Sequence, residues 1–138
     1  MLPLLALTLI AVLPGELTAR RIPDAIPVAL LIAAASLAVL GEAGAPRSPG
    51  EIVAAAFLGF AIPATARGAT GGGLGLGDVK LSVGLFLLVG PVTGAAGLLI
   101  AALLAGAAWA LVGARREAGV PFGPYMVAGV FCAVLALW

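Results

Sequence analysis

The chain has 138 residues, of which 63% are hydrophobic and only 9% are charged. Soluble domains of this size carry about 25% charged residues, so the composition indicates a membrane protein embedded in a lipid bilayer. The formal net charge of +1 excludes the basic balance of a nucleic-acid-binding protein. With no His and one Cys, the chain lacks the usual ligands of a zinc or haem site. We therefore expect no metal and no cofactor, and chemistry from carboxylates, hydroxyls, lysine or the backbone.

Six apolar blocks, separated by short connections, take up nearly the whole chain. They lie at residues 2–15, 25–41, 52–66, 79–90, 91–113 and 121–138. A spanning helix needs about 20 apolar residues, so we expect the first block to continue past Pro14 to about Ala19, with Glu16 facing the bundle interior. A signal peptide is the alternative for this block, but it would carry positive charge before the apolar stretch. The expected fold class is all-α, a polytopic bundle of about six transmembrane helices forming one membrane-embedded domain over residues 1–138.

The basic residues are distributed unevenly between alternate connections. Only Arg47 lies in the second connection, and the first, third and fifth hold the rest: Arg20, Arg21, Arg67, Lys80, Arg115 and Arg116. Because Lys and Arg concentrate in the cytoplasmic loops of membrane proteins, the odd connections are expected in the cytoplasm and both termini outside. The fifth block is rich in Gly and Ala, which predicts close packing of its helix against a neighbour.

Residues 68–78 read GATGGGLGLGD, with six glycines in the ten positions before Asp78. This density of glycine predicts a flexible or tightly turned loop rather than helix. The segment has neither the GK[ST] ending of a nucleotide-binding loop nor a GxGxxG register. It places Asp78 at the start of an apolar helix, where the helix dipole favours an anionic carboxylate. Asp78 is therefore either a simple cap or a functional acid.

Glu16 is the second candidate acid, since the expected topology places it at the same membrane boundary as Asp78. Two carboxylates that share a site hold one proton between them and can act as acid and base around one water molecule. The alternative for Glu16 is an interfacial charge that pairs with Arg20. Other hydrolase chemistries are excluded because the chain has no HExxH motif, no His to activate a serine, and no base beside Cys132. A serine nucleophile with a lysine base, Ser82 with Lys80, is the remaining alternative, and their two-residue spacing disfavours it because it points them to different helix faces.

Three segments, in this order, resemble those of the prepilin peptidases, the type IV leader peptidase family. They are ELTARRIPD at residues 16–24, GLGLGDVKL at residues 73–81 and VPFGPYMVAG at residues 120–129. The second resembles the family's GxGD motif with its Val-Lys-Leu continuation, and the third resembles its Pro-Phe-Gly-Pro segment. The resemblance implies catalytic roles for Asp78 and Glu16 and substrate-binding or site-shaping roles for Gly75, Gly77, Lys80, Pro121, Phe122, Gly123 and Pro124.

The chain departs from the family pattern at one position, because Glu16 stands where the family has Asp. The longer side chain keeps the carboxylate but moves it by about one bond, and catalytic placement tolerates only about half an ångström. Asp24 directly follows Pro23, at a position where the family commonly has Asn or Asp. We therefore do not expect Asp24 to be the missing acid. A catalytically impaired relative that binds prepilins as an assembly factor is therefore one alternative. Another alternative is a small membrane transport protein. The apolar centres of the spans argue against it, because ion pathways usually contain acidic or polar residues deep in the membrane.

By resemblance, the chain is a short, peptidase-only form of the family, without the paired CxxC motifs of its longer members. The implied activity is that of an aspartic endopeptidase in the bacterial or archaeal cytoplasmic (inner) membrane. It would cleave the basic leader from precursors of type IV pilins, tight-adherence pilins or type II secretion pseudopilins. The active site is expected on the cytoplasmic side, and the expected partners are the precursor and the lipid bilayer.

Overall fold

The computed structural model describes residues 2–19, 24–40, 48–69, 71, 74–112 and 122–137. These residues form six helices and no strand, which confirms the expected all-α class. The helices are α1 (Leu2–Ala19), α2 (Ala25–Leu40), α3 (Pro49–Ala69), α4 (Leu76–Val89), α5 (Pro91–Val112) and α6 (Phe122–Leu137). The first helix passes Pro14 and ends at Ala19, as the apolar pattern predicts.

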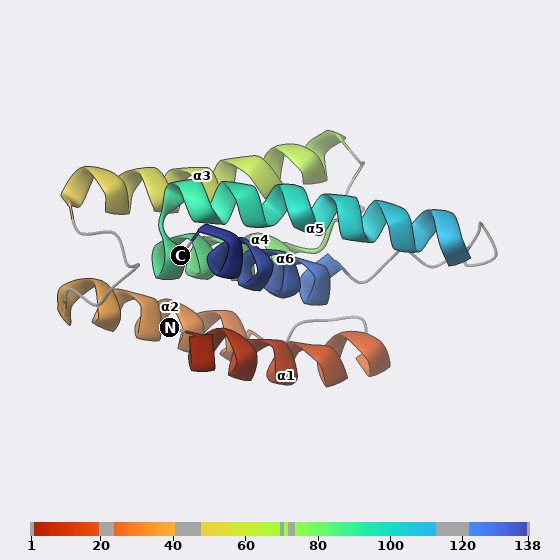
Figure 1. Ribbon diagram of the computed structural model, residues 1–138, viewed down its shortest axis with the longest axis horizontal. Helices are drawn as coiled ribbons and strands as arrows, with labels where there is room; N and C mark the ends of the chain where they lie inside the picture. The colour runs from red at the N-terminus through yellow and green to blue at the C-terminus, as the bar shows by residue number, and fades with distance from the viewer. Residues whose placement is uncertain are drawn as a thin grey trace.

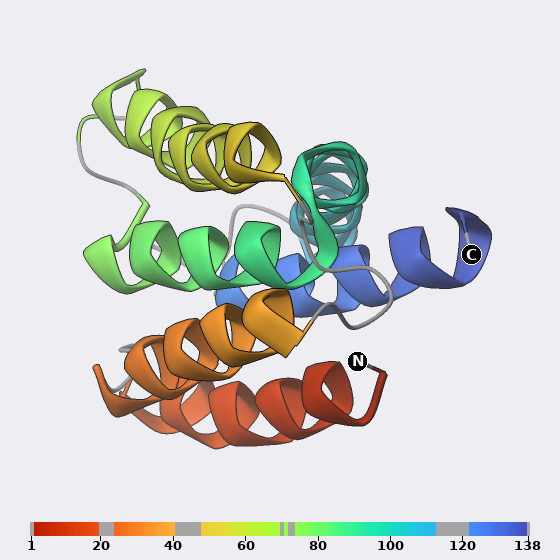
Figure 2. The same ribbon diagram turned by 90° about the vertical axis from the view of Figure 1, so that its left-hand side faces the viewer.

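Successive helices run in opposite directions, so alternate connections lie at opposite ends of the bundle (Figures 1 and 2). The carboxyl ends of α1 and α3 and the amino ends of α2, α4 and α6 share one end, which we call the Asp78 end. Helix α4 is central and packs on α2, α3, α5 and α6. Helix α1 packs on α6 and α2, and the most extensive helix–helix interface joins α5 to α6.

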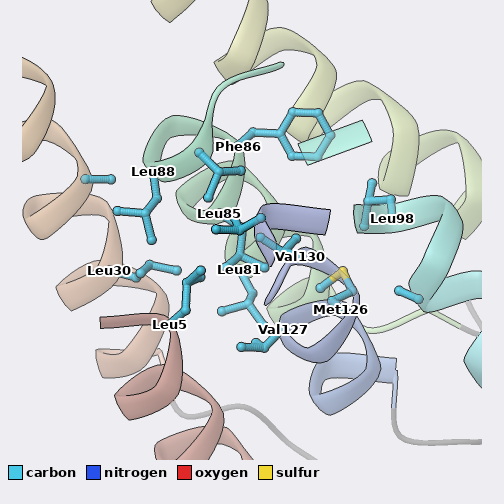
Figure 3. Packing of buried hydrophobic residues seen from close by; sticks show 14 of the residues in the cluster. Leu5, Leu30, Leu81, Leu85, Phe86, Leu88, Leu98, Met126, Val127 and Val130 are labelled. Carbon is cyan, nitrogen blue, oxygen red and sulfur yellow. The ribbon is translucent and has the colours of Figure 1, made fainter. Parts of the chain in front are cut away.

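Burial distinguishes α4 from the other five helices. Its large apolar side chains form the middle of the core cluster in Figure 3, with Leu81, Leu85 and Phe86 fully buried. Leu76 is the only large apolar side chain of α4 that is exposed among the residues described. The other helices expose many, such as Leu7, Val28, Phe57, Leu99 and Leu135. Such outward-facing apolar surface is expected where the surroundings are lipid rather than water.

Close packing of α5 against α6 depends on glycine. A Cβ added to Gly97 would lie 2.5 Å from Val130 Cγ2, and one added to Gly129 would meet the Gly97 carbonyl oxygen and lie 2.7 Å from the Ala101 nitrogen. Such distances are too short for any side chain, so the two backbones approach each other only because both positions are glycine. The predicted close packing of the Gly- and Ala-rich fifth block is confirmed.

A single residue, Gly90, connects α4 to α5. Its φ of 86° lies in the left-handed region, which glycine adopts without steric cost. The Gly90 N–H donates to the Phe86 carbonyl at 2.8 Å, and the Gly94 N–H donates to the Gly90 carbonyl at 3.0 Å. This turn ends α4 abruptly and reverses the chain direction.

In the part of the chain that the structure describes, two helices are long and apolar enough to cross a membrane by themselves, namely α3 and residues Pro91–Ala108 of α5. Shorter apolar helices lie at Ala25–Leu37 and Phe122–Leu137. Helix α4 has 14 residues and is therefore about 21 Å long, less than the roughly 30 Å hydrocarbon layer of a bilayer. Because other helices surround α4, the Asp78 side chain in its first turn is buried by protein.

Candidate functional site

The glycine-rich connection is shorter than the sequence indicates. Helix α3 continues through Gly68 to Ala69, and α4 begins at Leu76, so Gly68 and Gly77 are helical rather than part of a loop. A glycine costs a helix only about 1 kcal/mol relative to alanine, which neighbouring packing readily offsets near a helix end. Gly71 does require glycine, because its φ is +61°.

Gly75 is the N-cap residue of α4 and holds the Asp78 carboxylate. Its carbonyl accepts hydrogen bonds from the N–H groups of Asp78 (3.2 Å) and Val79 (3.4 Å), and its own N–H donates to Asp78 Oδ2 at 3.2 Å. On the α3 side, the Arg67 guanidinium donates to the Leu74 carbonyl. A Cβ added to Gly75 would lie 3.3 Å from Asp78 Oδ2, so even alanine would crowd the carboxylate.

The capping contact of Asp78 uses only one of its two carboxylate oxygens. Its side chain is only 5% exposed, and while Oδ2 receives the Gly75 N–H, Oδ1 has no hydrogen-bond partner in the described part of the chain. Leaving a buried polar atom unpartnered costs about 1–3 kcal/mol, so such atoms in native proteins call for an explanation, such as a bound water or a catalytic role. A capping role accounts for one carboxylate oxygen and leaves the other available for chemistry.

Ser82 lies one helical turn after Asp78 and is fully buried, with an Oγ that likewise finds no partner among the residues described. The prediction that Ser82 and Lys80 point to different faces is confirmed, because the Lys80 side chain is 55% exposed. Sequence alone relates Ser82 to Lys80 as a possible nucleophile–base pair and gives it no role beside Asp78. The signal that could have related Ser82 to Asp78 is their i, i+4 spacing, which places both residues on one helix face.

Lys80 bonds outward, away from the core. Its Nζ lies 2.7 Å from Asp24 Oδ1, which joins the residue before α2 to the first turn of α4. Both side chains are mostly exposed, so the pair contributes at most about 1 kcal/mol. Asp24 is therefore engaged at the surface by Lys80, and the expectation that it is not the second acid stays a prediction.

Glu16 lies in the last turn of α1, whose carboxyl end shares the Asp78 end of the bundle (Figures 1 and 2). Its side chain lies outside the described part of the structure, so its meeting with Asp78 stays a prediction. In the described residues, the backbone of α1 packs on α6 and α2 and makes no close approach to α4.

The start of α6 lies at the same end of the bundle (Figure 2). Phe122 and Pro124 are half-buried, Gly123 is buried, and Phe122 packs against the core cluster. Pro121 lies outside the described residues. Because α6 begins at this end, Phe122, Gly123 and Pro124 in its first turn lie at the Asp78 end, and α6 also packs on α4. No group of three or more potential metal ligands comes together in the described ranges.

Comparison with protein families matches residues 3–111 to the type IV leader peptidase family. The matched segment contains Glu16 and Asp78 and ends before α6. Neither the curated proteins nor the solved structures give a match to the chain. Because the family match covers far more than half of the 138 residues, the chain belongs to the type IV leader peptidase family, whose members are aspartic-type membrane peptidases acting on prepilin-type substrates.

Proposed function

We propose that this protein removes the short basic leader from prepilin-like precursors at the cytoplasmic face of the membrane, with Asp78 and Glu16 as its catalytic residues. The observation that carries the proposal is the Asp78 carboxylate, buried in the first turn of the central helix with one oxygen held by Gly75 and the other unpartnered among the described residues. Family membership supplies the reaction class, and this carboxylate supplies the group on which the chemistry depends.

In the proposed mechanism, the two carboxylates share one proton and hold one water molecule between them. The ionised carboxylate takes a proton from the water. At the same time, the water oxygen attacks the scissile carbonyl carbon and forms a tetrahedral intermediate. The protonated carboxyl donates its proton to the leaving amine nitrogen as the C–N bond breaks. The products are the free leader and a mature protein with a new amino terminus, and no redox step or added reactant is needed.

The position of Asp78 suits a substrate with two dissimilar halves. A prepilin joins a basic leader to a long apolar helix, so its cleavage point lies where cytoplasm meets lipid. Gly75 is exposed and Gly77 is half-buried, and neither has a side chain that would keep an extended substrate backbone from Asp78. The uneven distribution of Lys and Arg supports a cytoplasmic location for this end of the bundle, with both termini outside.

The proposal is tested with the purified full chain in detergent and a synthetic prepilin peptide that spans the leader junction. Mass spectrometry of the products should find one cut, directly after the leader. Binding of the peptide without cleavage, by both the parent and Glu16→Asp, would instead identify an assembly factor. This second function is favoured only by the glutamate at position 16.

The proposed orientation has a separate test by cysteine labelling of intact cells, starting from a chain in which Cys132 is replaced by alanine. A cysteine at position 47 should react with a membrane-impermeant reagent from outside. A cysteine at position 70 should react only after the membrane is opened. The reverse pattern would place the Asp78 end on the outer side of the membrane and would contradict the proposed cleavage of prepilins.

A further inference from the structure

Ser82 and Asp78 carry two unpartnered oxygens on one face of the central helix. Ser82 is 0% exposed and Asp78 is 5% exposed. Residues four apart lie on the same helix face, with Cβ atoms about 5–6 Å from each other. Asp78 Oδ1 and Ser82 Oγ are the buried side-chain atoms without a hydrogen-bond partner in the part of the chain that the structure describes. The side chains that carry these two unpartnered atoms therefore lie on the same face of α4.

Two other helical hydroxyls provide a contrast. Ser36 donates to the Ile32 carbonyl at 2.9 Å, and Thr65 donates to the Ala61 carbonyl at 2.6 Å. Both are exposed, and both use the carbonyl four residues earlier, as serine and threonine in helices commonly do. Ser82 makes no such bond, although it is buried and has no access to solvent. Its donor is not used by its own helix.

The surroundings of Ser82 offer no other reason for a hydroxyl. Its neighbours Leu81, Leu85 and Phe86 are fully buried, and an alanine at this position would fit such an apolar core without a desolvation cost. A buried serine hydroxyl without a polar partner lowers the stability of the fold. The polar atom on the same face that also lacks a partner is Asp78 Oδ1.

We propose that Ser82 is a positioning residue for Asp78, to which it is joined through one bound water. The Ser82 hydroxyl donates to the water, and the water donates to Asp78 Oδ1, while the Gly75 N–H holds Oδ2. With both oxygens held, the carboxylate cannot rotate about its Cβ–Cγ bond. Each oxygen retains a second acceptor site for the reacting water. The inference rests on the proposed function, in which Asp78 is one of the two catalytic carboxylates.

The first measurement separates turnover from substrate binding. Ser82→Ala should lower kcat for the prepilin peptide by about tenfold with KM unchanged, because the loosened carboxylate misplaces the water without altering substrate contacts. Ser36→Ala, which removes a helical hydroxyl on the bundle surface, should leave kcat and KM unchanged. A kcat of Ser82→Ala equal to that of the parent overturns the proposal.

The second measurement needs no enzymatic activity. A thermal double-mutant cycle combines Ser82→Ala with Asp78→Ala, or with Asp78→Leu if the alanine variant does not fold. Ser82→Ala should lower Tm in detergent by about 3 °C in the parent and by less than about 1 °C when Asp78 is absent, because coupled residues are not additive. Equal shifts in the two backgrounds overturn the proposal. Unequal shifts in a parent that does not cleave prepilin would keep the Ser82–Asp78 link and refute the proposed function alone.

Discussion

The α5–α6 interface and the first turns of α4 are both buried, but they differ in what fills them. Between α5 and α6, the contact is made by Gly97, Ala101, Gly129 and Val130, which bring backbone against backbone with no room for another atom. In the first turns of α4, burial takes in a carboxylate and a hydroxyl, and each keeps an oxygen without a partner among the described residues.

This difference separates the source of stability from the source of chemistry. The glycine contacts gain van der Waals energy from close approach and leave nothing to react. Burial of the polar atoms of α4 carries a desolvation cost, and in return they keep hydrogen-bonding capacity for a substrate or water. Changes in the first region should therefore affect mainly folding, and changes in the second should affect mainly turnover, with small losses of stability.

The largest effect is expected for Asp78→Asn, which keeps the size of the side chain and an oxygen for the Gly75 N–H but removes its acid–base function. Cleavage of the prepilin peptide should fall by at least about 1000-fold, or roughly 4 kcal/mol of transition-state stabilisation. Tm should change by less than about 3 °C.

The matched control is Glu51→Gln, the same kind of change in an exposed carboxylate of α3 at the opposite end of the bundle (Figure 1). It should cleave as the parent does. Unfolding of Asp78→Asn would show that the carboxylate stabilises the bundle, and the separation of the two regions would then be wrong.

The next largest effect is expected for Gly129→Ala, which places a methyl group against the Gly97 carbonyl and 2.7 Å from the Ala101 nitrogen. Since the obstacles are backbone atoms, relief requires the helices to separate, at a cost of about 2–3 kcal/mol in the free energy of unfolding. Thermal unfolding in detergent measures the loss.

Gly106→Ala in α5 is the matched control, because a Cβ there meets nothing within 4 Å. Alanine favours helix over glycine, so this variant should be as stable as the parent or slightly more stable. If both alanine variants lose the same stability, glycine is needed in α5 and α6 for reasons other than close approach.

A smaller effect is expected at position 16. Glu16→Asp should raise cleavage by about tenfold, near 1.4 kcal/mol, or create it where the parent has none, because aspartate restores the reach of the family's acid. Glu16→Gln should be inactive, and Asp24→Asn should cleave like the parent. Initial rates with the prepilin peptide measure all three. Active Glu16→Gln together with inactive Asp24→Asn would name Asp24 as the partner of Asp78.

The smallest effect is expected at the surface of α4. Lys80→Ala removes the ion pair with Asp24 and should cost less than about 1 kcal/mol in the free energy of unfolding, since both side chains are mostly exposed. The loss should shrink in high salt, which screens exposed charges. Adding Asp24→Ala should bring little further loss. A fall in kcat of more than about twofold in Lys80→Ala would give Lys80 a part in the site itself.

Several features followed from the sequence because they depend on residues close together in the chain. The six helices and most of their bounds reflect runs of apolar residues. The carboxyl end of α1 and the amino end of α4 lie at the same end of the bundle because helices joined by short connections alternate in direction. The GxGD segment identified Asp78 as an acid at a helix start. The Gly- and Ala-rich pattern of the fifth block predicted the close approach of α5 to α6.

Other features depended on packing between distant segments. The predicted glycine-rich loop at residues 68–78 was too long. Glycine content indicates how much free energy helix formation costs, but not which packing contacts offset that cost. The centrality of α4 and the burial of Ser82 arise because α2, α3, α5 and α6 all cover this helix. Lys80 pairs with Asp24, 56 residues earlier, across the gap between α4 and the start of α2. Local sequence determined which residues can act as acids, and tertiary packing alone decided which of their oxygens are buried and which are already bonded.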